Sequence, residues 1–515
     1  GGSYRVYRQG TQLRHGELLR TEAGKEVARV DLPIRYLIGS GHFCRSYLVE
    51  VDGFLHESPI TWYAQKKSWG MSPGYDVPGH WGFERAVKIG CLNCHVGRAE
   101  PEDGSVHRMI IHEQPIGCEN CHGPGSKHVA FHRAGKLREG EEDRTIVNPA
   151  RLSRARLEAI CAVCHLNGVA SIPLRGRQVG EFRPGMLLTD YRTDYRFDTG
   201  SERMTVVGHM QQLRRSLCYQ GSKDLSCLTC HDPHAPEKPK DPIAFYRQKC
   251  LKCHAAKDCS LATAERLKKN AADDCVACHM PRGDTDIPHV AFTHHKIGVH
   301  QEPGQSNMGV RAPELVPLED VTRLPPIDQE RNLGLAYLRV STEADSPDSA
   351  RYRLHAQQHL ESVYGAGLRD GEIAAALAEI YAKQGDYAHA AAMAQEALQA
   401  KELANDRRAV VHLVLANYHI QERQFAQAAG LLEKLTRMRR HAEDWRVLGL
   451  VYLQQNEPAK AVQALSQALA IRPERAEIHL GLSQAYEQLG DRPNAEAHRE
   501  KAQWLMQHQA AGVRG

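Results

Sequence analysis

Twelve of the 15 cysteines stand in six C-x-x-C pairs, and a histidine follows each pair at once. The motifs read CLNCH, CENCH, CAVCH, CLTCH, CLKCH and CVACH. C-x-x-C-H is the attachment signature of c-type haem: two thiols bond to the vinyl groups and the histidine ligates the iron. Zinc ribbons and redox dithiols also use C-x-x-C, but neither needs a histidine after every pair. The spacing therefore predicts six covalently attached haems c.

Each residue of the motifs has an expected role. The predicted thioether cysteines are Cys91, Cys94, Cys118, Cys121, Cys161, Cys164, Cys227, Cys230, Cys250, Cys253, Cys275 and Cys278. The predicted proximal iron ligands are His95, His122, His165, His231, His254 and His279.

Other histidines are candidates for the opposite side of each iron. Electron-transfer haems of the low-spin type need a second axial ligand, and a neutral imidazole suits this role. His234 lies too close to His231 for both to bind one iron, so it would serve a neighbouring haem. For any single histidine, an ordinary surface or hydrogen-bonded role is the alternative. The candidates favoured by their position beside a motif are His80, His128, His234, His289 and His295.

Three cysteines, Cys44, Cys218 and Cys259, lie outside the motifs. An exported protein can form disulfides, and we expect Cys218 and Cys259 to be the pair. Three buried thiols are the alternative.

Export itself is expected because this kind of haem attachment takes place outside the bacterial cytoplasm. The chain begins GGSYRV, without Met or an apolar leader, which predicts a signal peptide already removed and a periplasmic, extracellular or cell-surface location.

Composition excludes two classes of partner. No run of 18 apolar residues is present, which predicts no transmembrane helix. Lys+Arg 66 against Asp+Glu 62 is too balanced to indicate a nucleic-acid-binding surface.

The pattern along the chain predicts a multidomain protein. Residues 1–90 alternate like strands, with a turn at Asp52-Gly53, and are expected to form a small β-rich segment packed on the cytochrome domain. Residues 91–300 hold every motif and are expected to form a haem-cored domain of short helices and loops. Its clearest helix is RLSRARLEAICAVCH. Residues 301–330 are a Pro-rich connector.

Residues 331–515 repeat with a period of about 34 residues. One unit reads WRVLGLVYLQQNEPAKAVQALSQALAIRP, which closely resembles the tetratricopeptide consensus. We expect an all-α solenoid of four or five helical hairpins that forms a separate domain. Such solenoids present a concave surface, which would dock a redox protein or another copy of this chain.

The order of these parts resembles a family of exported multihaem c-type cytochromes with C-terminal tetratricopeptide repeats. The stretches that carry the resemblance include YLIGSGHFCRSYL, ITWYAQKKSWGMSPGYD, CENCHGPGSKHV and CVACHMPRGDTDIPHVAFTHH. It is distantly similar to the tetrahaem cytochromes of nitrifying bacteria and to the hydroxylamine-oxidoreductase superfamily. The resemblance implies seven distal ligand candidates for six irons: His42, His80, His128, His209, His234, His289 and His295.

Two functions fit these features. The first, which we favour, is electron transfer through six haems by a carrier or a polymeric conduit rather than an enzyme. The alternative is a multihaem oxidoreductase that acts on a small nitrogen or sulfur compound at one open iron. No C-x-x-C-K motif is present, and no residue is nominated as catalytic.

Overall fold

The computed structural model describes residues 2–21, 23–39, 41–77, 79–135, 141–166, 168–198, 207–235, 239–255, 258–285, 287, 291–300, 313–343 and 348–509. The chain folds as two compact units. The first combines the residues up to Gln114 with those from Gln357 onward, and the second is Pro115–Ala356. These boundaries differ from the four consecutive segments that the sequence predicted.

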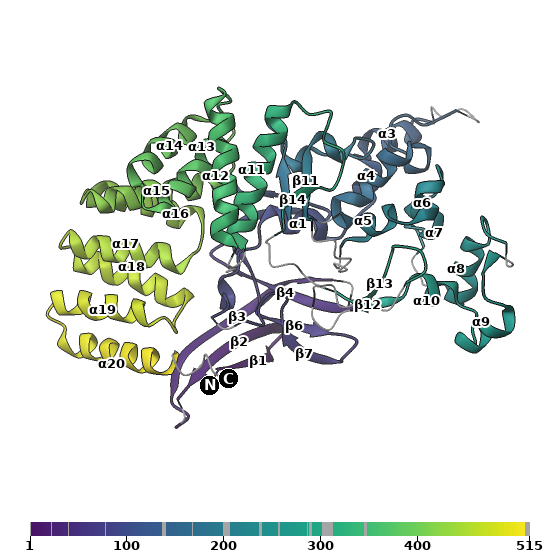
Figure 1. Ribbon diagram of the computed structural model, residues 1–515. Coiled ribbons are helices and arrows are strands. Elements are labelled where there is room, and N and C mark those ends of the chain that lie inside the picture. Colours follow the sequence, from purple (N-terminus) through teal and green to yellow (C-terminus); the bar gives the residue numbers. More distant parts are fainter. Residues whose placement is uncertain are drawn as a thin grey trace. The chain divides into compact units, whose positions relative to one another are not determined.

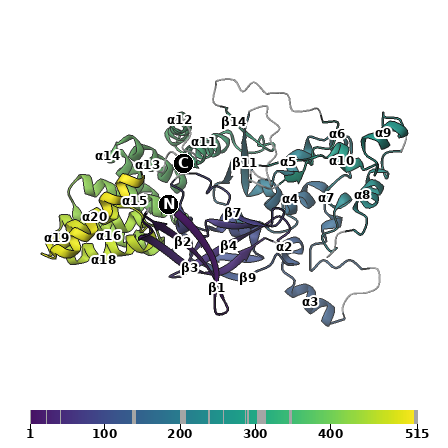
Figure 2. The same cartoon turned by 90° about the horizontal axis from the view of Figure 1, so that it is seen from below.

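An antiparallel seven-stranded sheet opens the first unit, in the order β1-β2-β3-β4-β6-β7 with β5 paired to β4. Figure 2 labels β1 to β4 of this sheet. The predicted β-rich segment is thus present, and the turn at Asp52-Gly53 joins β4 to β5 with positive φ at both residues. The stretches whose alternation predicts strands, YRVYR, EVARVDL and SYLVEVDGFLHESPITWY, do not include β2 or β7. The strands are β1 (Gly2–Gln9), β2 (Gln12–Arg20), β3 (Glu26–Ile38), β4 (Cys44–Val51), β5 (Phe54–Glu57), β6 (Ile60–Tyr63) and β7 (Ser68–Met71).

Short elements follow the sheet and carry the first motif. They are η1 (Gly82–Glu84), α1 (Ile89–His95), β8 (Arg98–Pro101) and β9 (Met109–Glu113). Leu92 of α1 is fully buried in a cluster with Leu48 of β4 and Leu55 of β5. This apolar contact holds the first C-x-x-C-H helix against the sheet.

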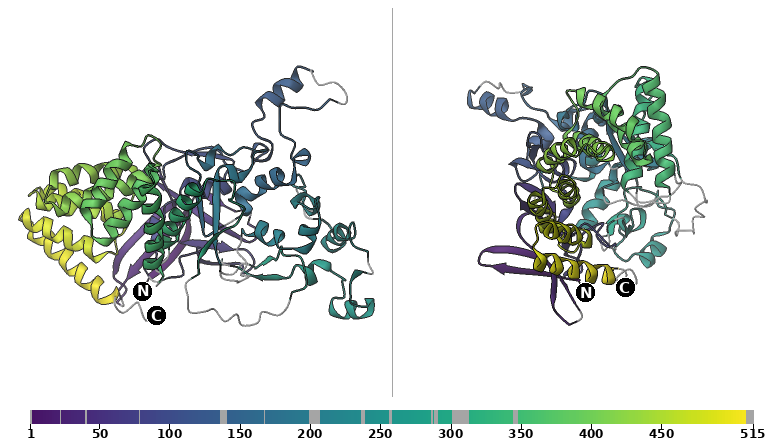
Figure 3. Two further views of the ribbon diagram at one scale, coloured as in Figure 1. Left: turned by 45° about the horizontal axis from the view of Figure 1, so that its top comes forward. Right: turned by 90° about the vertical axis from the view of Figure 1, so that its left-hand side faces the viewer.

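The C-terminal helices pair into hairpins that stack side by side (Figures 1 and 3). Local signals define their ends: Asp370 caps the first turn of α13, and Gly385 ends it with a left-handed φ. Four hairpins, α13–α14 to α19–α20, match the predicted number. The helices are α12 (Ser349–Gly365), α13 (Gly371–Gln384), α14 (Tyr387–Gln399), α15 (Asn405–Gln421), α16 (Phe425–Met438), α17 (Ala442–Gln454), α18 (Pro458–Ile471), α19 (Ala476–Gln488) and α20 (Arg492–Gln509).

Small residues allow these helices to approach closely. A Cβ atom added to Gly449 of α17 would lie 2.5 Å from Cγ of Leu465 in α18. Ala461 and Ala468 of α18 are completely buried. The close approach explains why the repeat needs small residues at these positions.

We expect Gly449→Ala to lower the free energy of unfolding by about 1–3 kcal/mol, because the added methyl group overpacks the contact with Leu465. Denaturant unfolding followed by far-UV circular dichroism measures the change. Gly430→Ala in α16 is the matched control, since its methyl group would meet no atom within 4 Å. There the higher helix propensity of alanine should leave stability equal or greater. Equal destabilisation by both changes would contradict the packing argument.

The repeat helices also contact the N-terminal residues of their own unit. Val27 of β3 shares a buried cluster with Ala502 and Leu505 of α20. The Val106 backbone N–H donates to the Met438 carbonyl over 2.8 Å. Sequence analysis expected residues 331–515 to form a separate domain, but the structure joins residues 357–509 to the N-terminal sheet by apolar and polar contacts.

The second unit contains short helices around the remaining motifs and a three-stranded sheet in the order β10-β11-β14. Part of the predicted connector is β14, and residues 301–312 lie outside the described residues. The helices are α2 (Glu119–His122), α3 (Ser126–Arg133), η2 (Pro149–Arg151), α4 (Arg154–His165), η3 (Val179–Glu181), η4 (Leu188–Asp190), α5 (His209–Arg214), α6 (Leu217–Gly221), α7 (Cys227–Cys230), α8 (Pro242–Cys250), α9 (Thr263–Lys269), α10 (Cys275–His279) and α11 (Pro326–Glu343). The strands are β10 (Ala170–Pro173), β11 (Arg192–Phe197), β12 (Arg282–Asp284), β13 (Ala291–Thr293) and β14 (Leu315–Pro317).

Apolar burial is unevenly distributed in this unit. A cluster around Ala159 and Ala162 of α4 also contains Leu188 and Met210. Between residues 214 and 300, by contrast, no apolar side chain is fully buried among those that the structure describes. Across all described residues, no helix combines the length and apolar character needed to cross a membrane.

Candidate functional site

Helical turns position the cysteines of the motifs. Residues three apart in a helix lie on the same face, so both thiols of a motif point to one side and the histidine follows one residue later. The fifth motif begins at Cys250, the last residue of α8. The other five motifs lie in or at the end of α1, α2, α4, α7 and α10.

Local capping explains why two of these short helices form. In α7, Ser226 and Thr229 make a reciprocal capping box around the first turn. In α10, the Asp274 side chain accepts from the Val276 backbone N–H over 2.9 Å. Both caps stand immediately before or within a motif, so they fix the turn that carries its cysteines.

Four of the predicted iron ligands contact an oxygen acceptor through Nδ1. His122 donates to the Val147 carbonyl over 2.7 Å, and His279 donates to the Gly298 carbonyl over 3.0 Å. His295 donates to the Thr293 carbonyl over 2.9 Å. A carbonyl can only accept, so Nδ1 carries the proton and the Nε2 lone pair is the one available to a metal. The fourth, His128, contacts Asp143 through Nδ1 at 2.5 Å.

Two of the predicted proximal histidines lie close to predicted distal histidines. The ring centroids of His122 and His234 lie 6.0 Å apart, and the ring planes are 22° apart. The ring centroids of His231 and His295 lie 6.2 Å apart, and the ring planes are 25° apart. Two imidazole nitrogens on opposite sides of one metal ion lie about 4 Å apart, and the ring centres then lie about 6 Å apart. The centroid separation of both pairs would thus allow each pair to hold one metal ion between its two imidazoles.

A further group surrounds His209. Its ring lies edge-on to His165 with centroids 5.1 Å apart, and 4.5 Å from the ring of His295. Burial lowers the pKa of His209 to about 3 and the pKa of His295 to about 4. Burial also lowers the pKa of His165 and His231. All four imidazoles are therefore neutral near pH 7, which is the form that binds a metal.

The third and fourth motifs are neighbours in this unit. The Cys161 and Cys227 thiols share a hydrogen bond, which lowers the pKa of Cys161. The same bond, together with burial, raises the pKa of Cys227. Both side chains belong to the small apolar cluster around α4.

Other predicted ligands have different surroundings. Both ring nitrogens of His80 have protein partners: Nε2 lies 2.8 Å from the Tyr4 hydroxyl, and Nδ1 accepts from the Gly82 N–H. This geometry does not favour His80 as an iron ligand. His42 is exposed in the bend between β3 and β4. His289 lies outside the described residues.

His128 lies in a polar cluster that sequence analysis did not foresee. Asp143 contacts Nδ1 of His128 and, at 3.0 Å, Nε2 of His132. The ligand atoms of these three residues lie within 4.8 Å of one another, close enough to share a metal ion. No sequence signal identified Asp143, because it follows His128 by 15 residues without a motif around it.

The predicted disulfide between Cys218 and Cys259 is not formed, and both thiols are free. Cys218 lies near the motif cysteines Cys230 and Cys253. Cys259 instead contacts Arg266 of α9. The two thiols are held by different neighbours, and a disulfide requires Cα atoms within about 7 Å.

Comparison with known proteins identifies the C-terminal helices. Residues 374–408 match the family described as Tetratricopeptide repeat, and residues 449–490 match the one described as TPR repeat. The C-terminal region is therefore a tetratricopeptide-repeat region, as its sequence predicted.

Solved structures of MamA are similar to about a third of the chain. MamA MSR-1 is 23% identical with a TM-score of 0.30, covering 35% of this chain and 97% of that chain. MamA AMB-1 is also 23% identical with a TM-score of 0.30, covering 34% of this chain and 96% of that chain. No curated protein matches the sequence.

Proposed function

We propose that this protein transfers electrons through six covalently attached haems c, and that its repeat region docks a redox partner or a second copy of the chain. The observation that carries the proposal is the combination of the C-x-x-C-H motifs with the closely spaced imidazole pairs His122–His234 and His231–His295. Each pair joins a motif histidine to an imidazole from another part of the chain. A bound haem c would supply one-electron redox chemistry at these positions.

The residues present fit such a group. Residues 214–300 carry three motifs, yet their described part has no fully buried apolar side chain. A stretch of this length without an apolar core does not fold stably by itself in water. Flat apolar groups attached at Cys227, Cys250 and Cys275 would provide the missing buried surface.

The chain's own residues would then set the iron ligation. Carbonyl oxygens accept from Nδ1–H of His122, His279 and His295, which leaves the Nε2 lone pair of each ring available to a metal. Burial keeps His165, His209 and His231 neutral. If two imidazoles ligate each iron, no position on the iron is left for a substrate. Such ligation suits an electron carrier.

Docking is assigned to the repeats because stacked helical hairpins present an extended surface to protein partners. Haem attachment of this type requires export, so we place the protein in the periplasm or at the cell surface.

Denaturing mass spectrometry of the matured protein tests the proposal. We expect the polypeptide mass plus six haem masses, since the thioether bonds survive unfolding. Peptide mapping should place the haems on the motif cysteines and leave Cys44, Cys218 and Cys259 unmodified. Fewer than five haems on fully exported protein would contradict the proposal.

The ligand pairing has its own test. His295→Ala should remove the partner of His231 and convert one iron to a high-spin form that binds carbon monoxide. Absorption and electron paramagnetic resonance spectra measure the change, with the covalent haem count unaffected. His112→Ala is the control, because His112 is bonded to Glu100 and faces no motif histidine. If the unmodified protein already binds carbon monoxide, the enzyme alternative replaces the carrier.

A further inference from the structure

The second unit contains a cavity of about 550 Å³ whose lining includes no histidine. It is bounded by the start of α4, the segment between β10 and η4, and the start of α11. Residues that line it include Arg156, Arg175, Arg177, Arg323, Asp190 and Asp328. Four guanidinium groups against two carboxylates leave an excess of two positive charges around one cavity.

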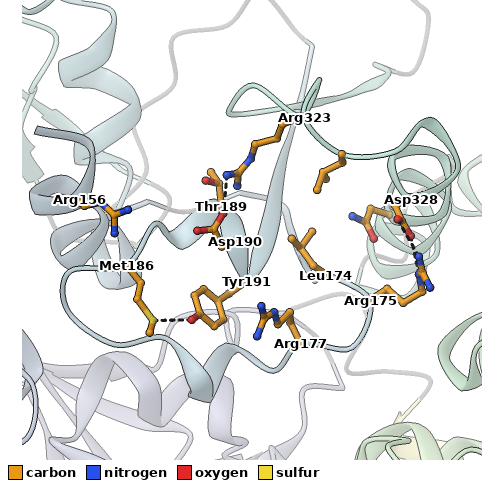
Figure 4. Close-up of a pocket in the computed structure, with 12 residues that line it drawn as sticks. Arg156, Leu174, Arg175, Arg177, Met186, Thr189, Asp190, Tyr191, Arg323 and Asp328 are labelled. Carbon is orange, nitrogen blue, oxygen red and sulfur yellow. Dashed lines mark hydrogen bonds and ion pairs between the residues drawn. The ribbon is translucent and has the colours of Figure 1, made fainter. Parts of the chain in front are cut away.

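The carboxylates are already engaged. Figure 4 shows Arg175 paired with Asp328 on one side of the cavity and Arg323 paired with Asp190 on another. The Arg175 pair is bidentate, at 2.8 and 3.2 Å, and the Arg323 pair measures 2.6 Å. These pairs neutralise two of the four cations, so the excess charge belongs to the remaining two.

Those two arginines have weaker partners. Arg177 lies over the Tyr191 ring at 5.4 Å and 3.9 Å from the Glu181 carboxylate. Arg156 donates to the Gly185 carbonyl, which carries no net charge. Each guanidinium has five N–H donors, so both retain donors for an anion.

A buried amide supplies the independent observation. Asn332 of α11 lines the cavity and is 1% exposed. Its Oδ1 accepts from Arg331 over 2.8 Å, and a guanidinium can only donate, so the amide orientation is fixed. Its Nδ2 has no hydrogen-bond partner among the described residues. A buried donor without an acceptor is costly, which indicates that an acceptor occupies the cavity in the functional protein.

We propose that this cavity binds a free small oxyanion, of the dicarboxylate, tricarboxylate or phosphate class, between Arg156, Arg177 and Asn332. Carboxylate and phosphate oxygens match the guanidinium donors in number and charge. The volume accommodates a metabolite-sized molecule. This inference does not depend on the haems and goes beyond the electron-transfer proposal.

Calorimetric titration of the holoprotein with citrate, succinate and inorganic phosphate, each at low ionic strength, tests the site. At least one probe should bind, and added salt should weaken the binding. Arg177→Gln and Arg156→Gln should each weaken it about tenfold or more. Asn332→Asp replaces the donor by a like charge at equal size and should abolish it.

Arg196→Gln on β11 is the matched control, since Arg196 is exposed and does not line the cavity. Circular dichroism and the haem absorbance verify that each variant is folded. Binding that persists in the cavity variants would overturn the proposal, as would no binding of any probe at millimolar concentration. If no probe binds but the Arg156 and Arg177 variants shift a haem potential, the cavity holds a haem propionate and the free-anion proposal is wrong.

Discussion

Replacing Glu84 by glutamine should destabilise the first unit by about 3 kcal/mol, because it breaks a buried ion pair. Glu84 of η1 is 6% exposed, and its Oε2 lies 3.1 Å from Arg472, which is 7% exposed. Its Oε1 accepts from the Ala442 backbone N–H over 2.5 Å. Arg472 also donates to the carbonyls of His80 and Trp81. Glu474 remains as a second partner of Arg472, which places the cost at the lower end for a broken buried pair.

Denaturant unfolding followed at the helical signal measures this loss. Glu26→Gln is the control, because the Glu26–Arg29 pair lies at the surface and should contribute little. The double variant Glu84→Gln with Arg472→Met should recover part of the loss, since the buried cation that lost one of its two carboxylate partners is then removed as well. If Glu84→Gln proves neutral, the N-terminal residues do not anchor the repeat helices through this pair.

The second large effect is expected when the haems of residues 214–300 cannot attach. Serine at all six motif cysteines from Cys227 to Cys278 should leave this stretch without a core. No apolar side chain is fully buried among its described residues, so the polypeptide alone does not supply the apolar core that the haems would provide. Hydrogen exchange and limited proteolysis should then show loss of nearly all protection across 214–300.

The repeat helices provide the internal reference for that experiment. Residues 371–509 have their own buried clusters, around Ala394 and Leu465 for example, and should stay protected. Cys44→Ser, outside the motifs, should change neither region. Equal protection of 214–300 with and without the cysteines would show that the segment folds by itself and would remove a main support for the haem proposal.

The sequence by itself determined the local features. Cysteine spacing predicts the haem chemistry, and the Asp52-Gly53 turn, helix α4 and the tetratricopeptide repeats follow from patterns within a few dozen residues. These signals are local because a helical turn, a hairpin turn or a repeat is specified by neighbours in the chain. The same reasoning did not name β2, because its sequence QLRHGELLR does not alternate clearly, although Gly10 with a positive φ stands in the turn before it.

Only the tertiary structure decided which distant residues meet. His234 lies 112 positions after His122 and His295 lies 64 after His231, so spacing could propose each as a ligand but not assign its partner. Glu84 and Arg472 are 388 positions apart, and neither carries a motif that marks it. Their pairing joins the N-terminal sheet to the repeats, where composition predicted separate domains. A polar side chain that folding removes from water requires a hydrogen-bond or ion-pair partner. For these side chains the partner lies far away in the sequence, so only the folded chain brings the two together.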